Sequence, residues 1–172
     1  WVGEMLEAGH DSFYRVANST RECYDPVSKT YKVIPGQDGR VNLEYVGDDK
    51  VVWSNSGTTI KDIGDGILNI EFHTKMNSIG GEVLQGLNKV IDLAEEGYKG
   101  VVISNNGGNF SAGANVGMIF MLAVEQEWEE LDAAVKYFQD TMMRMRYSGI
   151  PVVAAPHNMA LGGGCELCLH AD

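Results

Sequence analysis

The chain has 172 residues, 44% of them hydrophobic, which is enough for one packed domain or for a domain and a tail. Its formal net charge of −11 argues against nucleic acid or an anionic membrane as a partner, because both require a basic surface. No apolar run approaches the roughly 20 residues of a membrane span. The longest run, GIPVVAAPHNMALGG, is interrupted by two prolines and several glycines.

The three cysteines are odd in number and unevenly spaced, so they do not resemble a disulfide framework. Since the chain also starts without a signal peptide, a reducing cytoplasm is the expected compartment. The chain opens on Trp1 and closes on LCLHAD without a helix stop signal. We therefore expect it to be part of a longer polypeptide.

Residues 1–50 are expected to form a helical and irregular segment that ends in a linker. The chain starts with helical spacing, because Val2, Met5 and Leu6 lie on one face of a helix. From Asp25 onward, turn-forming pairs such as Asp-Pro and Pro-Gly predict turns and short irregular strands.

Residues 51–172 have a second composition and are expected to form one α/β unit. Runs rich in β-branched residues alternate with segments of helical spacing, which predicts parallel strands and right-handed crossovers. Asn77 and Ser78 offer an N-cap for the first of these helices. The expected elements are strands at 50–56 and 66–72, a helix at 80–97, a strand at 99–107, one or two helices in 116–147, a strand at 150–156 and a helix at 161–171.

Two glycine-rich junctions each follow a predicted buried strand. They are residues 105–118, NNGGNFSAGANVGM, and residues 158–167, NMALGGGCEL. Glycines at a helix start expose N–H groups where unpaired donors and the helix dipole favour negative charge. Two such groups aimed at one point form an oxyanion hole. Spacing alone leaves open that both junctions are ordinary turns between a strand and a helix.

Glu166 is a single carboxylate in the apolar stretch that follows the second junction. As a first-turn residue it could complement the helix dipole, or it could act as an acid or base on a ligand held by the glycine N–H groups. Its apolar setting predicts a nearly buried side chain. Met118 and Met121 follow the first junction and could line a flexible apolar pocket.

Other chemistries find little support in the sequence. Cys165 and Cys168 form a C-x-x-C pair near His170, but further ligands are lacking, so we expect packing residues and no metal site. Ser111 does not stand in a G-x-S-x-G elbow. Neither G-x-G-x-x-G after a strand nor G-K-[ST] occurs, so nothing in this chain indicates nucleotide binding.

The two junctions, in this order, resemble the enoyl-CoA hydratase/isomerase (crotonase) family. The matching residues are FSAGAN and PVVAAPHNMALGGGCE, and GILNIEFHTKMNSIGGEVLQGLNKVI is similar to the family's opening strand and first helix. The resemblance covers roughly residues 60–172. It implies an α/β, crotonase-like ββα superhelix of which this chain holds the N-terminal half.

Carried over by position, the resemblance implies a role for each of several residues. The N–H groups of Ala114 and Gly163 would hold the thioester carbonyl of an acyl-CoA. Glu166 would be the first of two catalytic glutamates that position and deprotonate a water, with the second lying beyond Asp172. The residues expected around the bound substrate are Ala112, Gly113, Met118 and Gly162.

The implied function is hydration of trans-2-enoyl-CoA in fatty-acid β-oxidation, carried out by a longer parent enzyme of the homo-oligomeric, trimeric type. Residues 1–172 alone would be inactive. The segment EMLEAGHDSFY also resembles the end of a 3-hydroxyacyl-CoA dehydrogenase part. NAD would bind only in such a part, and no cofactor is expected in this chain. Two alternatives remain: an enoyl-CoA isomerase or another enolate reaction on the same scaffold, and a non-catalytic acyl-CoA-binding or assembly module.

Overall fold

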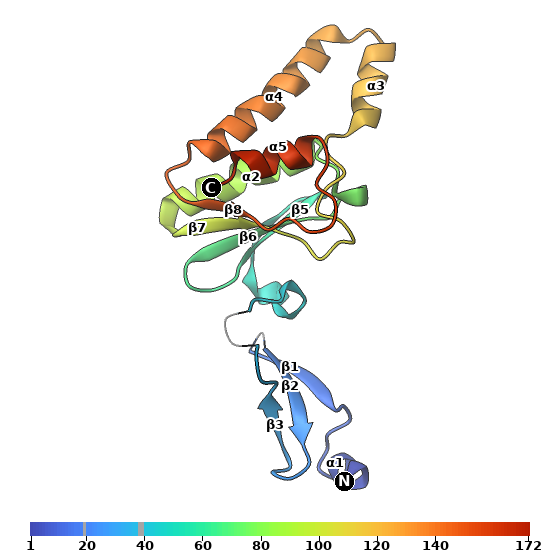
Figure 1. Ribbon diagram of the computed structural model, residues 1–172, viewed down its shortest axis with the longest axis vertical. Coiled ribbons are helices and arrows are strands. Elements are labelled where there is room, and N and C mark those ends of the chain that lie inside the picture. The colour runs from blue at the N-terminus through green and yellow to red at the C-terminus, as the bar shows by residue number, and fades with distance from the viewer. Residues whose placement is uncertain (19, 38–39) are drawn as a thin grey trace. The chain divides into compact units, whose positions relative to one another are not determined.

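The structure is a computed structural model that describes residues 1–18, 20–37 and 40–172 (Figure 1). The chain divides into two compact units, Trp1–Asp48 and Asp49–Asp172. The first contains a three-stranded sheet and the second a five-stranded sheet.

The first unit is a small antiparallel sheet accompanied by a short helix. Its elements are α1 (Val2–Glu7), β1 (Tyr14–Ala17), β2 (Thr20–Asp25), β3 (Thr30–Val33) and a 3-10 turn, η1 (Leu43–Tyr45). Tyr24 is 2% exposed, and its ring packs against those of His10 and Tyr31 at centroid distances of 5.5 and 5.6 Å. The helix expected at the start of the chain and short strands after Asp25 are present, but β1 and β2, where helix was expected, form a sheet with β3 because aromatic and β-branched residues pair across these strands.

Asp25 closes the turn between β2 and β3 with three hydrogen bonds. Its carboxylate accepts from the Val27 N–H (3.1 Å), the Ser28 hydroxyl (2.7 Å) and the Lys32 ammonium. These bonds, above all the one from Lys32, hold the pKa of Asp25 well below its usual range.

We expect the first unit to lose stability in acid through Asp25. Because the folded-state pKa of Asp25 is lowered, its stabilisation is complete above the unfolded pKa of about 3.9 and is lost as the pH falls further. Urea titrations at about pH 6 and about pH 3, followed by NMR of the β2 and β3 amides, measure this loss. Asp25→Asn should weaken the sheet at the higher pH and make it less sensitive to acid. Equal acid sensitivity in the two proteins would contradict the assignment.

The second unit is built on a mixed sheet with the strand order β4-β5-β6-β7-β8. β4, β5 and β6 are antiparallel neighbours, whereas β6, β7 and β8 run parallel. The α/β class is confirmed, but the antiparallel half, including β5, was not expected. The strands are β4 (Val51–Ser54), β5 (Thr58–Asp62), β6 (Ile67–Phe72), β7 (Gly100–Ile103) and β8 (Val152–Ala154), and the 3-10 turn η2 (Asp48–Lys50) precedes them.

Helices cover one face of this sheet in two layers. α2 packs directly on β5, β6 and β7, and α4 lies over α2 and α5 (Figure 1). Side chains at helical spacing on α2, such as Val83, Leu87 and Ile91, meet Leu68 and Ile70 of β6 in the core. The helices are α2 (Gly81–Gly97), α3 (Val116–Val124), α4 (Trp128–Arg146) and α5 (Gly163–His170), with the 3-10 turn η3 (Lys75–Asn77) before α2.

The N-cap expected at Asn77 or Ser78 is wrong. Gly80 caps α2 without a side-chain hydrogen bond. The Asn77 amide instead donates to the carbonyl of Asn109 at 3.0 Å. This side chain is therefore used to hold the first glycine-rich junction.

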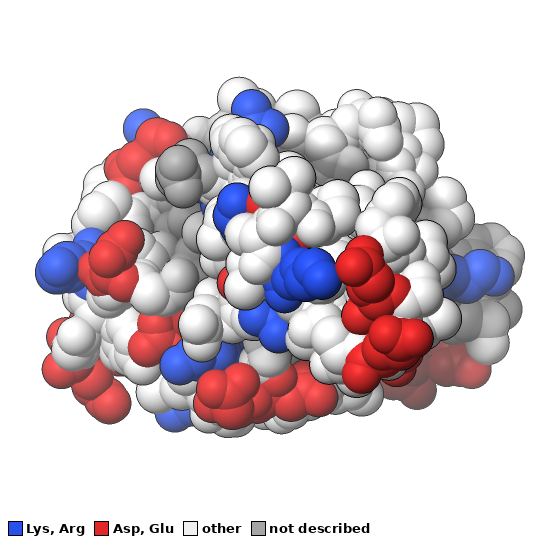
Figure 2. Space-filling view, turned by 90° about the horizontal axis from the view of Figure 1, so that it is seen from below, with Lys and Arg blue, Asp and Glu red and all other residues white. Residues whose placement is uncertain are grey.

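Charged side chains are mixed rather than sorted on the face drawn in Figure 2. Lys and Arg lie among Asp and Glu there, with no broad basic field on that face. Within residues 1–18, 20–37 and 40–172, no helix is long and apolar enough to cross a membrane.

Candidate active site

The two glycine-rich junctions lie side by side because short parallel bridges extend beyond the ends of the strands. Ile79 pairs with Ala114, through an Ile79 N–H bond to the carbonyl of Gly113 (2.8 Å) and an Asn115 N–H bond to that of Ile79 (3.1 Å). Ser111 pairs in the same way with Ala160. Segments far apart in the sequence thus meet at one edge of the unit.

The buried hydroxyl of Ser111 joins three of these segments. It donates to the carbonyl of Asn77 at 2.7 Å and accepts from the N–H of Gly113 at 3.0 Å. The Ser111 backbone is bonded to the second junction, where its carbonyl accepts from the N–H of Leu161 at 3.0 Å. A Cβ on Gly164 would lie 2.8 Å from the Ser111 Cβ, so the second junction packs directly on this side chain.

Glycine is required where the two junctions touch. Gly113 has φ +96°, and a Cβ there would lie 2.6 Å from the carbonyl oxygen of Leu161. A Cβ on Gly163 would lie 3.3 Å from the backbone nitrogen of Ala114. The Ala114 and Gly163 backbones are therefore close neighbours.

The N–H groups of Ala114 and Gly163 have no hydrogen-bond acceptor among the residues that the structure describes. Gly163 is the first residue of α5, where a helix leaves its N–H unpaired. Ala114 is half-buried and Gly163 is buried. The two donors can therefore serve a ligand.

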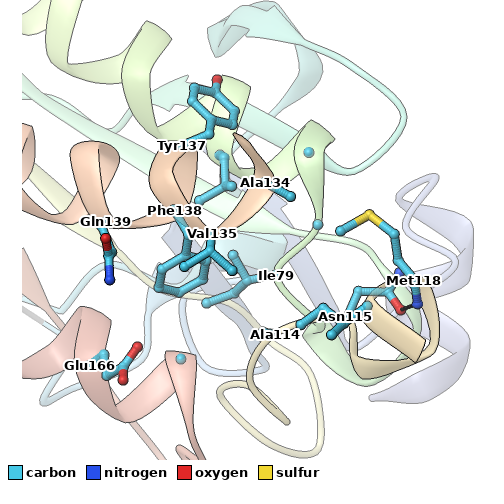
Figure 3. Close-up of a pocket in the computed structure, with 15 residues that line it drawn as sticks. Ile79, Ala114, Asn115, Met118, Ala134, Val135, Tyr137, Phe138, Gln139 and Glu166 are labelled. Atoms are coloured by element: carbon cyan, nitrogen blue, oxygen red, sulfur yellow. Dashed lines mark hydrogen bonds between the residues drawn. The ribbon is translucent and has the colours of Figure 1, made fainter. Parts of the chain in front are cut away.

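A cavity of about 420 Å³ opens beside these donors (Figure 3). Ala114, Gly163, Met118 and Glu166 all line it, so the structure brings together four of the seven residues proposed from the sequence. Most of the wall is apolar and includes Ile79, Leu84, Ile119, Val135 and Phe138. In Figure 3, Glu166 lies at one end of the labelled group and Met118 at the other.

The other three proposed residues shape the turns instead of lining the cavity. Gly113 and Gly162 have positive φ angles of 96° and 46°, and Gly162 caps α5. The N–H of Ala112 donates to the carbonyl of Met76 at 3.1 Å. Direct substrate contact by these three residues stays a prediction. Met121, also considered, is 53% exposed and does not line this cavity.

Glu166 is exposed, so the nearly buried carboxylate expected from the sequence is wrong. Its backbone N–H bonds to the carbonyl of Gly162 at 3.0 Å, which places it in the first turn of α5. The side chain stands at the rim of the cavity because the helix packs its other face, with Leu167 fully buried, against the core. A carboxylate at this rim has access to water and to a ligand in the cavity.

Sequence reasoning did not identify the residues of α4 that line this site. Ala134, Val135, Tyr137, Phe138 and Gln139 all line the cavity. Their spacing places them on neighbouring turns of one helix. The acidic and amphipathic appearance of the helix gave no indication of which face would meet the glycine junctions.

Cys165 and Cys168, the C-x-x-C pair, both lie on α5 as free cysteines. Cys165 is exposed, and burial, followed by the neighbouring Cys165, raises the pKa of the Cys168 thiol. Over residues 1–18, 20–37 and 40–172, no three His, Cys, Asp or Glu side chains gather as metal ligands would. The expectation that this chain holds no cofactor stays a prediction.

Comparison with known proteins identifies the family to which this fold and these paired junctions belong. Residues 62–172 match the family model described as "Enoyl-CoA hydratase/isomerase". The chain belongs to this family, which is also called the crotonase family.

Two curated relatives that the chain matches are considerably longer than it is. It is 41% identical to the "Probable 3-hydroxyacyl-CoA dehydrogenase" of Bacillus subtilis over 99% of the chain and 22% of that relative. It is 31% identical to the "Putative fatty acid oxidation complex trifunctional enzyme" of Rickettsia prowazekii over 84% of the chain and 20% of that relative. The chain thus spans about a fifth of the length of these two relatives.

Solved structures agree on the fold of the second unit. The crystal structure of an enoyl-CoA hydratase from Thermoplasma volcanium superposes with a TM-score of 0.59 and 27% identity. That superposition covers 69% of this chain and 47% of the other. About half of a crotonase domain is therefore represented here.

We expect Gly113→Ala to disturb the contact between the junctions. The unfavourable φ angle costs about 1–3 kcal/mol by itself, and the new Cβ would collide with the Leu161 carbonyl. Gly108→Ala is the matched control, since a Cβ at Gly108 meets nothing within 4 Å and its φ is not in the left-handed region. Urea unfolding, monitored by circular dichroism, should show a clear loss of stability for Gly113→Ala only. Equal stability of the two variants would contradict this packing.

Proposed function

We propose that these residues form the oxyanion hole and the first acid–base group of an enoyl-CoA hydratase, acting on trans-2-enoyl-CoA in fatty-acid β-oxidation. One observation carries the proposal: the unpaired N–H groups of Ala114 and Gly163 lie together in an apolar cavity that Glu166 borders. Membership of the crotonase family supports the same reaction class.

In the proposed reaction, the thioester carbonyl oxygen accepts hydrogen bonds from both N–H groups. Glu166 takes a proton from a water as the water oxygen forms its bond to the β-carbon. The electron pair of the double bond moves toward the thioester, and the negative charge collects on the carbonyl oxygen. A second acid donates a proton to the α-carbon, which completes the addition of water, and Glu166 releases its proton to solvent. Backbone donors positioned in an apolar cavity are well suited to stabilise this charge, because they need no reorganisation.

The names of the relatives support a place in β-oxidation. The "fatty acid oxidation complex" proteins and the dehydrogenase that the chain resembles are multifunctional or dehydrogenase-containing. We propose that the parent protein likewise has a dehydrogenase part, which would be the part that binds NAD, and that it is a cytoplasmic homo-oligomer. Acyl-CoA thioesters are the proposed substrates of the residues described here.

Glu166→Gln should reduce hydration in the full natural polypeptide that carries this chain. The amide cannot accept the proton from water, and loss of a general base typically lowers kcat about 100- to 10,000-fold. Binding of a saturated acyl-CoA, measured by calorimetry, should change little because the N–H groups remain. Cys165→Ser is the matched control, since Cys165 is exposed on the same helix turn and does not line the cavity.

The outcomes of this experiment separate the candidate functions. Near-normal hydration by Glu166→Gln would contradict the hydratase assignment. Shift of a 3-enoyl double bond to the 2-position, without hydration, would instead identify an isomerase. Acyl-CoA binding with no turnover in the unmodified protein would identify a binding module.

The donor role of Gly163 is tested by comparing Gly163→Pro with Gly163→Ala. Both variants add a Cβ beside Phe138, but only proline removes the N–H, and proline is well tolerated at the first position of a helix. Because loss of one oxyanion donor typically lowers kcat about 100- to 1,000-fold, the proline variant should be that much slower than the alanine variant. Equal hydration rates would show that this N–H does not bind the substrate.

A further inference from the structure

Phe138 of α4 stands directly beside Gly163, which carries one of the two N–H donors. A Cβ built on Gly163 would lie 2.6 Å from Cζ of Phe138, 3.1 Å from its Cε2 and 3.3 Å from the nitrogen of Ala114. The edge of the aromatic ring and the Ala114 N–H therefore flank the same point. A carbonyl oxygen held by both donors would have the ring as its immediate neighbour.

Phe138 and Glu166 line the same cavity. In Figure 3, Phe138 is seen between Glu166 and Ala114. If the proposed function holds, the thioester oxygen is at the donors and the β-carbon faces Glu166. The α-carbon and β-carbon of the substrate must then run along the edge of the Phe138 ring.

The surroundings of Phe138 hold the ring in this position. It is half-buried and packs against the hydrophobic core of the second unit. Val135, on the preceding turn of α4, lines the same cavity and leaves an apolar wall beside the ring. A supported aromatic wall excludes bulky groups by steric clash, which is a common source of specificity.

We propose that Phe138 is a specificity-determining residue that excludes acyl groups with a substituent on the α-carbon. The site then accepts straight-chain 2-enoyl thioesters and rejects 2-methyl-branched ones. This inference rests on the proposed function for the orientation of the thioester, and on the contact between Phe138 and Gly163 for the position of the wall.

The test compares 2-butenoyl-CoA with 2-methyl-2-butenoyl-CoA in the full natural polypeptide. Phe138→Ala should raise the kcat/KM ratio of the branched to the straight substrate by about 10-fold or more, because one methyl group in an apolar pocket changes discrimination about 10- to 200-fold. Leu131→Ala is the matched control. Leu131 is half-buried two turns earlier on the same face of α4 but does not line the cavity, so this ratio should stay constant.

A binding measurement separates failure of this inference from failure of the proposed function. Butanoyl-CoA and 2-methylbutanoyl-CoA are titrated calorimetrically into the same variants, and the ratio of their affinities should shift in the same direction. Absence of hydration in the unmodified protein would overturn the proposed function. The ratio of the two affinities would then still test the role of Phe138. If the branched-to-straight affinity ratio is unchanged in folded Phe138→Ala, or changes equally in Leu131→Ala, the role of Phe138 is overturned. If circular dichroism shows that the alanine variant is unfolded, Phe138→Leu replaces it, with a smaller expected rise.

Discussion

The hydrogen bonds of Ser111 hold the two glycine-rich junctions at a fixed separation, and the candidate site depends on this separation. The hydroxyl pairs with the carbonyl of Asn77 and the N–H of Gly113, while the backbone pairs with the second junction. Buried polar groups must find partners, and here these contacts satisfy the groups around Ser111. The N–H groups of Ala114 and Gly163 are left over, side by side, at the cavity.

Two kinds of element meet at this cavity and contribute different properties. The ends of the parallel strands lead into backbone donors whose positions are set by bridges and close glycine contacts. The helices supply the environment: α4 brings an apolar wall with Phe138, and α5 brings Glu166 to the rim. Low-polarity surroundings strengthen hydrogen bonds to a developing charge, whereas an exposed carboxylate keeps access to water. The site combines both conditions in one cavity.

Local patterns were sufficient for much of the second unit. Apolar residues at helical spacing located α2, and β-branched runs located β6, β7 and β8. They were insufficient for the first unit, where β1 and β2 lie in a region of expected helix and pair with β3 in one sheet. The difference has a physical cause. Strands of four to six residues are stabilised mainly by side chains on the neighbouring strand, such as Tyr24 and Tyr31. A short window of sequence does not show which residues will pair in this way.

The sequence by itself determined the α/β class, because apolar runs and their spacing are local properties, and its resemblance to the crotonase family gave Ala114, Gly163 and Glu166 as candidates. Only the tertiary structure decided that the two donors are adjacent, that Glu166 is exposed and that Phe138 stands beside them. The reason is distance along the chain. Backbone groups in separate junctions are brought together by the sheet and its bridges, and which face of α4 meets them depends on how α4 packs over α2 and α5.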